Sequence, residues 1–171
     1  MKNLILILLF SFCFGNTSIA QTSDNQHIEN AQEKADMMVK AFKNKDYSTF
    51  LDLTHPKVVE LAGGKEKMLK ILNEGLGPGI EVLEVEIYNP STLIRKDGTL
   101  QCSFKQKQFM KIGDQKIYTI GSLIGISYDK GAYWSFIGVA SNTLATIQAS
   151  FPELSDELDV QPQSNPTFID N

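Results

Sequence analysis

The strongest constraint on the fold is an abrupt change in the spacing of apolar residues at the string Gly75-Leu76-Gly77-Pro78-Gly79. Before this string, apolar residues recur at intervals of three and four, which is the spacing of an amphipathic helix. After it, residues 83–88 alternate between apolar and polar side chains, as in a strand with one face in water. The sequence therefore predicts an α+β chain with its helices first and its sheet second.

Four helices are predicted in the first half of the chain. The longest covers 28–44, and the next begins after Asp46, a residue type that caps helix N-termini. The third begins at Pro56, since proline suits the first helical turn, and ends at Gly63-Gly64. The fourth covers 65–74 and ends at the glycine-rich string.

Turn signals divide the second half of the chain into strands. They are Lys96-Asp97-Gly98, Gly113-Asp114 and Asp129-Lys130-Gly131. They predict an antiparallel meander of four strands, at 80–95, 99–112, 115–128 and 132–140. A short helix is expected over 142–150, followed by an acidic, proline-containing tail at 151–171.

The first twenty residues have the pattern of a secretory signal peptide. Lys2 gives a basic start, an apolar run extends from Leu4 to Phe14, and the small residues Ser18 and Ala20 stand where a signal peptidase cleaves. The run is too short to stay in a bilayer of roughly 30 Å as a permanent helix. We therefore expect an exported protein, periplasmic or secreted, with no stable membrane insertion after cleavage.

Cleavage after residue 20 leaves 151 of the 171 residues, enough for one domain. We expect a flexible leader at 21–27 and a single domain at 28–150. Because Lys2 is lost from 16 basic residues while all 20 acidic ones remain, the net charge becomes −5. With no basic run, this balance argues against nucleic acid as a partner. No cofactor is expected.

Neither cysteine is expected to form a disulfide within the chain. Cys13 lies in the signal peptide, and Phe12 before it argues against lipidation. Cys102 is then the only thiol, and it shares strand parity with Leu100 and Phe104, so we expect it to be buried and structural. His27 falls in the leader, and no metal site is predicted.

Two segments in the helical half of the sequence resemble those of a known protein family. Their residues are 38–51 with Asp46-Tyr47, then His55-Pro56-Lys57-Val58-Val59-Glu60-Leu61 and Gly63-Gly64. The chain resembles exported NTF2-like proteins of unassigned function, of the Bacteroidetes type, over residues 28–140. The resemblance implies N-terminal helices packed on a curved four-stranded antiparallel sheet, the NTF2-like or cystatin-like α+β cone. This fold hosts isomerases, dehydratases, hydrolases, ligand binders and assembly modules, so it fixes no function.

Catalysis of the ketosteroid-isomerase type, which this fold supports, needs a carboxylate base facing hydroxyl or carboxyl donors in an apolar interior. Tyrosines are available at positions 47, 88, 118, 128 and 133. However, Asp97, Asp114 and Asp129 all lie in turn sequences, where aspartate forms the turn, and no residue matches the base. We therefore predict no catalytic residue.

Five residues are candidates for lining a pocket: His55, Gln106, Gln108, Tyr118 and Trp134. His55 either faces the mouth of the cone or caps the helix that begins at Pro56, and we favour the cap. Gln106 and Gln108 face inward if the parity of Cys102 continues, and are then the best ligand contacts. A β-bulge that turns Phe109 inward is the alternative, which we favour.

The predicted sheet carries apolar side chains on both faces, at Ile117, Leu123, Ile137 and Val139 among others. Either the tail covers the outer face or a homodimer forms through it, and the sequence leaves both open. Our leading hypothesis is a non-catalytic, exported module that binds a small apolar ligand or a protein partner. The alternatives are a small isomerase, dehydratase or hydrolase with His55 or a tyrosine as acid and base, and a structural dimerisation module.

Overall fold

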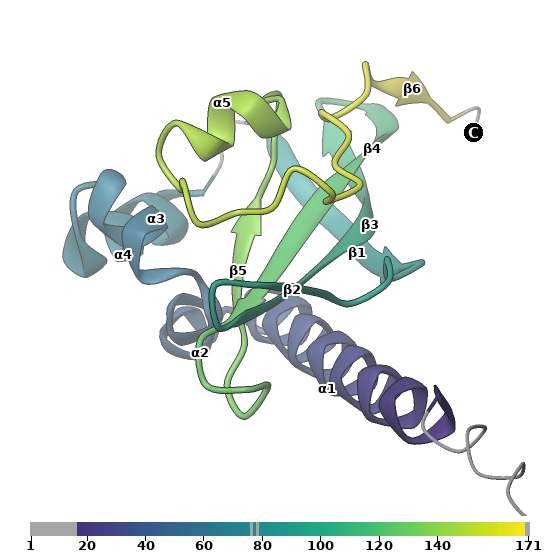
Figure 1. Ribbon diagram of the computed structural model, residues 1–171. Coiled ribbons are helices and arrows are strands. Elements are labelled where there is room, and N and C mark those ends of the chain that lie inside the picture. Colours follow the sequence, from purple (N-terminus) through teal and green to yellow (C-terminus); the bar gives the residue numbers. More distant parts are fainter. Residues whose placement is uncertain (1–16, 76, 78, 170–171) are drawn as a thin grey trace, which may run out of the picture.

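The chain folds with its helices before its strands, as the change of spacing predicts (Figure 1). The structure is a computed structural model that describes residues 17–75, 77 and 79–169. Its helices are α1 (Thr17–Lys43), α2 (Tyr47–Leu53), α3 (Pro56–Leu61), α4 (Lys65–Glu74) and α5 (Leu144–Gln148). Its strands are β1 (Ile80–Tyr88), β2 (Ile94–Lys96), β3 (Thr99–Ile112), β4 (Gln115–Ser127), β5 (Ser135–Gly138) and β6 (Thr167–Phe168).

Helix α1 is longer than the sequence indicates, because residues 21–27 are helical where a flexible leader is predicted. Two contacts with later elements account for the difference. The Arg95 side chain on β2 pairs with Asp24, and the His27 ring lies against Gly131. Neither partner is near in sequence, so the local composition gave no sign of them. Residues 1–16 of the predicted signal peptide lie outside the described residues.

Within the residues that the structure describes, the sheet has six strands, where four are predicted. The predicted first strand is divided into β1 and β2, because Asn89 has a φ of 49° and Pro90 follows it. The predicted last strand is shorter and forms β5, and the tail contributes β6. The main order is β1-β3-β4-β5, all antiparallel, with β2 beside β3 and β6 beside β4.

The register of the central pair decides which side chains share a face. Strands β3 and β4 pair without interruption from Leu100 opposite Ser127 to Ile112 opposite Gln115. The predicted β-bulge near Phe109 is therefore wrong. The irregularity lies in β1 instead, between Val82 and Glu84.

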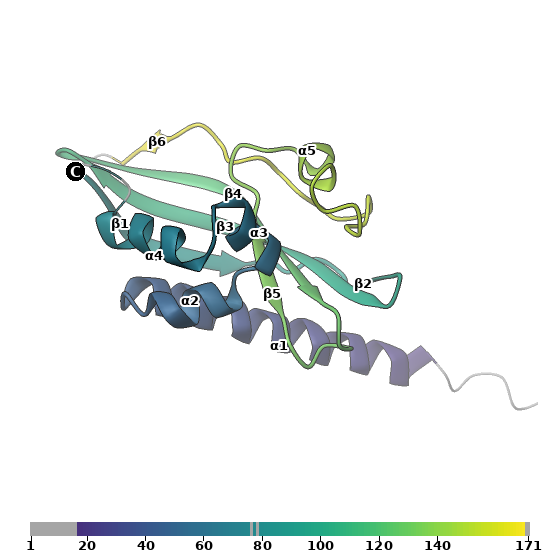
Figure 2. The same cartoon turned by 90° about the vertical axis from the view of Figure 1, so that its left-hand side faces the viewer.

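Each face of the sheet carries a buried core, and Figure 2 shows α1 and α2 on one side with α5 and the tail on the other. The helix-side core joins residues of α1 and α2 to the inner face of the sheet: Ala31, Ala35, Met38, Leu53, Leu100, Cys102, Phe104, Leu123, Trp134 and Phe136. The tail-side core includes Ile124, Ile126, Ile137 and Val139 under Ile147, Phe151, Leu154 and Leu158. The tail thus covers this part of the outer face, as one of the two alternatives predicts.

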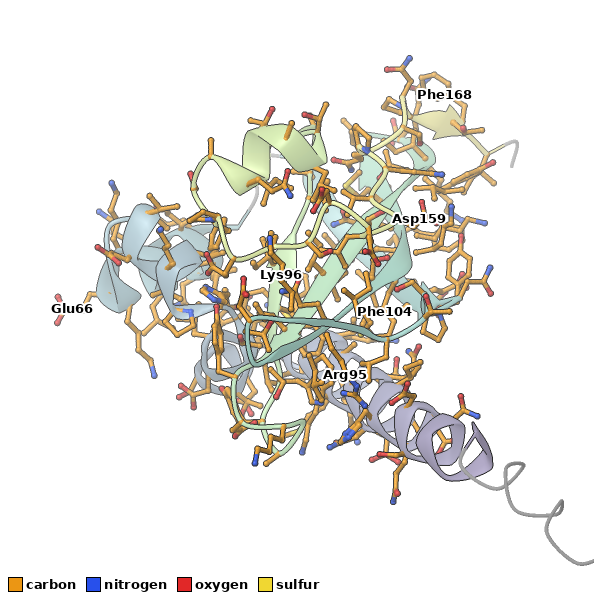
Figure 3. The ribbon with its side chains drawn as sticks, in the orientation of Figure 1. Glu66, Arg95, Lys96, Phe104, Asp159 and Phe168 are labelled. Carbon is orange, nitrogen blue, oxygen red and sulfur yellow. The ribbon has the colours of Figure 1, made fainter. Side chains whose placement is uncertain are left out.

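Lys96, which is labelled in Figure 3, ties the tail to β2. Its Nζ donates to the Leu154 carbonyl at 2.9 Å. Buried Gln101 adds two more links. Its Nε2 donates to the Glu153 carbonyl at 2.9 Å, and its Oε1 accepts from the Ser155 N–H at 2.9 Å. Within the described ranges, no helix has the length and apolar character needed to cross a membrane.

Candidate functional site

A pocket of about 180 Å³ opens on the helix-side face of the sheet, beyond the end of β5. Side chains and backbone of β3, β4, the end of β5 and the tail line it: Gln106, Gln108, Thr119, Gly121, Ser122, Gly138, Ala140 and Gln163. We call it the glutamine pocket. A water molecule in the liquid takes up roughly 30 Å³, so the pocket has the volume of about six waters. It therefore admits a small ligand or one side chain.

The uninterrupted register of β3 places the two central glutamines in this pocket. Gln106 pairs with Gly121 and Gln108 pairs with Thr119, so the four residues share the face that carries Cys102 and Phe104 further along. Gln106 and Gln108 are only partly buried, because the helix-side core ends before it reaches them. The alternative in which the parity of Cys102 continues to these glutamines is therefore the correct one, and the open space beside them removes the need for a bulge.

The tail supplies the remaining wall. Gln163 lies so close to Gly121 that a Cβ on Gly121 would stand 3.3 Å from the Gln163 Cα. The Gln163 side-chain Nε2 donates to Thr119 Oγ1 at 2.7 Å. Because Gly121 has no side chain, the tail can approach β4 closely here and form a wall of the pocket.

The lining of the pocket combines amide and hydroxyl groups with the carbon atoms of side chains and backbone, and none of the described lining residues is ionisable. An amide offers both a donor and an acceptor, so three glutamines present a mixed hydrogen-bonding surface. Such a surface matches a ligand that carries both donors and acceptors and no net charge. A charged ligand would lose hydration there without gaining a counter-charge.

His55 lies outside the pocket, in a separate hydrogen-bonded row. It is 5 % exposed, and its Nδ1 accepts from the Lys57 N–H at 3.2 Å, so it caps α3 as we favoured. With Nδ1 accepting, neutral His55 carries its proton on Nε2, which lies 2.9 Å from the Tyr128 hydroxyl. The Tyr128 hydroxyl in turn donates to Glu153 at 3.0 Å. The row joins α3, β4 and the tail.

Burial sets the titration of this row. Desolvation lowers the pKa of His55, against a smaller opposing effect of Glu153. Burial, together with the hydrogen bond to Glu153, raises the pKa of Tyr128 to about 12. At neutral pH the row is therefore a neutral imidazole and a neutral phenol, and the phenol donates to Glu153. It holds structure together and leaves no activated nucleophile.

The other two candidates are also outside the pocket. Tyr118 projects from the opposite face, where its ring packs on Phe109 with the Lys107 Nζ 4.3 Å from the Tyr118 ring centre. Trp134 is fully buried in the helix-side core. The structure therefore brings together Gln106 and Gln108 and separates them from His55, Tyr118 and Trp134.

Sequence reasoning missed Thr119 and Gln163. Thr119 had a usable signal, because it shares the strand parity of Ile117 and Leu123. Gln163 had none, since its position depends on where the tail crosses β4.

Cys102 is buried as predicted, and burial raises the pKa of its thiol to about 12. Such a thiol is not a nucleophile at neutral pH. Among the described residues, no group of three histidine, cysteine, aspartate or glutamate side chains is placed to hold a metal ion.

Comparison of the chain with protein-family models, with curated proteins and with solved structures finds no match.

Proposed function

We propose that this chain is an exported, non-catalytic binding domain of the NTF2-like type, whose glutamine pocket takes a small, uncharged polar ligand. The amide and hydroxyl groups of the lining are the reason for proposing a polar ligand, where the sequence led us to expect an apolar one. The helices on one face and the antiparallel sheet support the NTF2-like cone, and the N-terminal pattern supports export.

One observation carries the proposal. The Gln163 amide is bonded to Thr119, whereas the side-chain amides of Gln106 and Gln108 have no hydrogen-bond partner among the described residues. Two neighbouring amides on a half-buried sheet face are left with their donors and acceptors available. A ligand that satisfies them gains hydrogen bonds that the protein itself does not make.

The enzyme alternative has less support. Its acid–base candidates, His55 and Tyr128, are tied to each other and to Glu153, and none of the three lines the pocket. A homodimer has one specific observation in its favour. The outer face beyond the tail-side core carries the partly exposed pair Phe109 and Tyr118 with Lys107 above both rings, which suits a second copy.

The dimer is tested by sedimentation of the full mature chain and of a Lys107→Glu variant. A dimer that the variant dissociates supports this surface. A monomer at high protein concentration rules it out.

Ligand binding is tested by NMR titration of the mature chain, with the side-chain amides of Gln106 and Gln108 as reporters. The probes are acetamide, glycerol and glucose as neutral polar compounds, hexanol as an apolar one and acetate as a charged one. We expect the neutral polar probes to shift both amides. A Gln106→Leu, Gln108→Leu double variant should lose the response, and Gln115→Leu, at an exposed glutamine outside the pocket, should keep it.

Two outcomes would contradict the proposal. One is a response to hexanol alone. The other is an equal response to acetamide in the double variant, which would place binding elsewhere.

A further inference from the structure

The last part of the tail, residues 161–169, lies along the edge of β4, and we call it the strap. Strand β5 pairs with β4 only as far as Gly138, opposite Leu123. Beyond this point the strap lies along the same edge of β4, where β6 pairs with Ile117 and Tyr118. Between these two regions the Ser164 N–H donates to the Ile120 carbonyl at 2.7 Å. The strap is thus an added segment on an open sheet edge.

Several of the strap's hydrogen bonds use the β4 backbone, whereas its Gln161 and Gln163 N–H groups donate to the Ser122 Oγ and to the Ala140 carbonyl. The Ile120 N–H donates to the Ser164 Oγ at 3.0 Å, and the Ile169 N–H donates to the Lys116 carbonyl at 2.9 Å. Backbone groups are common to all peptides, so this edge can bind an extended chain of another sequence. Selectivity must then come from the side chain that enters the glutamine pocket.

That side chain is an amide. Gln163 stands over Gly121 and bonds to Thr119, next to Gln106 and Gln108 in the pocket lining. The strap has the sequence Gln161-Pro-Gln-Ser-Asn-Pro-Thr-Phe-Ile169 and carries no charged residue. The chain's own segment therefore indicates the chemistry that fits here: an extended, uncharged peptide with an amide side chain at the pocket.

The strap is held more weakly than the tail before it. Phe151, Leu154 and Leu158 are buried in the tail-side core, whereas residues 164–168 are exposed and Phe168, at the margin of the molecule in Figure 3, is 64 % exposed. Opening the strap therefore costs a few hydrogen bonds and little apolar burial. The tail-side core can stay closed while the edge of β4 becomes free.

We propose that the β4 edge and the glutamine pocket form one binding site for an extended, uncharged peptide of a partner protein, with a glutamine or asparagine side chain entering the pocket. The strap is the intramolecular occupant that this peptide displaces. The inference rests on the proposed function, because it names the ligand class of the same pocket.

The test uses the full mature chain with Ser164→Pro, which removes both the N–H and the hydroxyl that bond to Ile120. The probe is a nine-residue peptide with the strap sequence, blocked at both ends. We expect it to bind this variant at least tenfold more tightly than the wild type, by calorimetry. Ser164→Ala, which removes only the hydroxyl, should fall between the two. A peptide with alanine in place of its Gln163 equivalent should bind at least fivefold more weakly.

Far-UV circular dichroism and the melting temperature first establish that Ser164→Pro is folded. If the folded variant does not bind the peptide while acetamide still shifts Gln106 and Gln108, the inference fails and the proposed function stands. If neither binds, both fail. Concentration-dependent dimers of Ser164→Pro would instead assign the edge to the strap of a second copy, which overturns the assignment to a partner protein.

Discussion

Phe151, Leu154 and Leu158 of the tail complete the tail-side core, and replacing Leu154 tests this directly. Leu154 is 0 % exposed and packs in the tail-side core. Leu154→Ala removes three carbon groups, worth about 2.4 kcal/mol at roughly 0.8 kcal/mol each. The cavity left behind adds to this transfer cost, so we expect a loss of about 3 to 4 kcal/mol in the free energy of unfolding.

The measurement is urea denaturation of the full mature chain, followed by far-UV circular dichroism. The matched control is Leu61→Ala, since Leu61 is 63 % exposed and should change stability by no more than about 0.5 kcal/mol. A loss below about 1 kcal/mol for Leu154→Ala, in a protein that unfolds in one step, would refute the assignment of the tail to the core. It would mean that the tail detaches without cost and that the outer sheet face is free.

Three further outcomes concern His55, Tyr128 and Cys102. Burial holds the pKa of His55 in the folded protein below 6.5, so as the pH falls the unfolded chain binds a proton first. The stability contributed by neutral His55 is therefore full above pH 6.5 and declines below it. His55→Asn, which can still cap α3, should flatten this pH dependence of the free energy of unfolding between pH 7.5 and pH 5 in denaturation curves. Tyr128→Phe removes the hydroxyl between His55 and Glu153 and should cost about 1 to 2 kcal/mol in the same assay, and no loss would show that the row is not formed. Cys102 should resist iodoacetamide at pH 8 in the native protein and react fully in denaturant, and rapid native labelling would contradict its burial.

Local signals explain which parts of the fold were predictable. Asp46 and His55 cap α2 and α3 as expected, because a cap is decided by the three or four residues that follow it. The alternation of residues along β3 also indicated which of its side chains could share a face. The bulge near Phe109 was wrongly favoured over two inward-facing amides, because the sequence does not show that the helix-side core stops short of Gln106 and Gln108.

Long-range contacts explain the rest. The leader is helical because Arg95 pairs with Asp24, 71 positions earlier in the chain. The buried residues Phe151, Leu154 and Leu158 have an apolar spacing of three and four, but the surrounding acids and prolines made this segment look like a solvated tail. The pocket depends on where that tail crosses β4, which no local pattern specifies.

The burial of Trp134 determines what intrinsic fluorescence reports in this protein. It is the only tryptophan in the sequence, fully buried in the helix-side core, and its indole N–H has no hydrogen-bond partner within the described part of the chain. An indole in such an apolar setting emits at shorter wavelength than one in water. Its emission wavelength therefore reports the packing of α1 on the sheet and does not respond to opening of the strap or of the tail-side core. A red shift marks loss of the packing between the helices and the sheet.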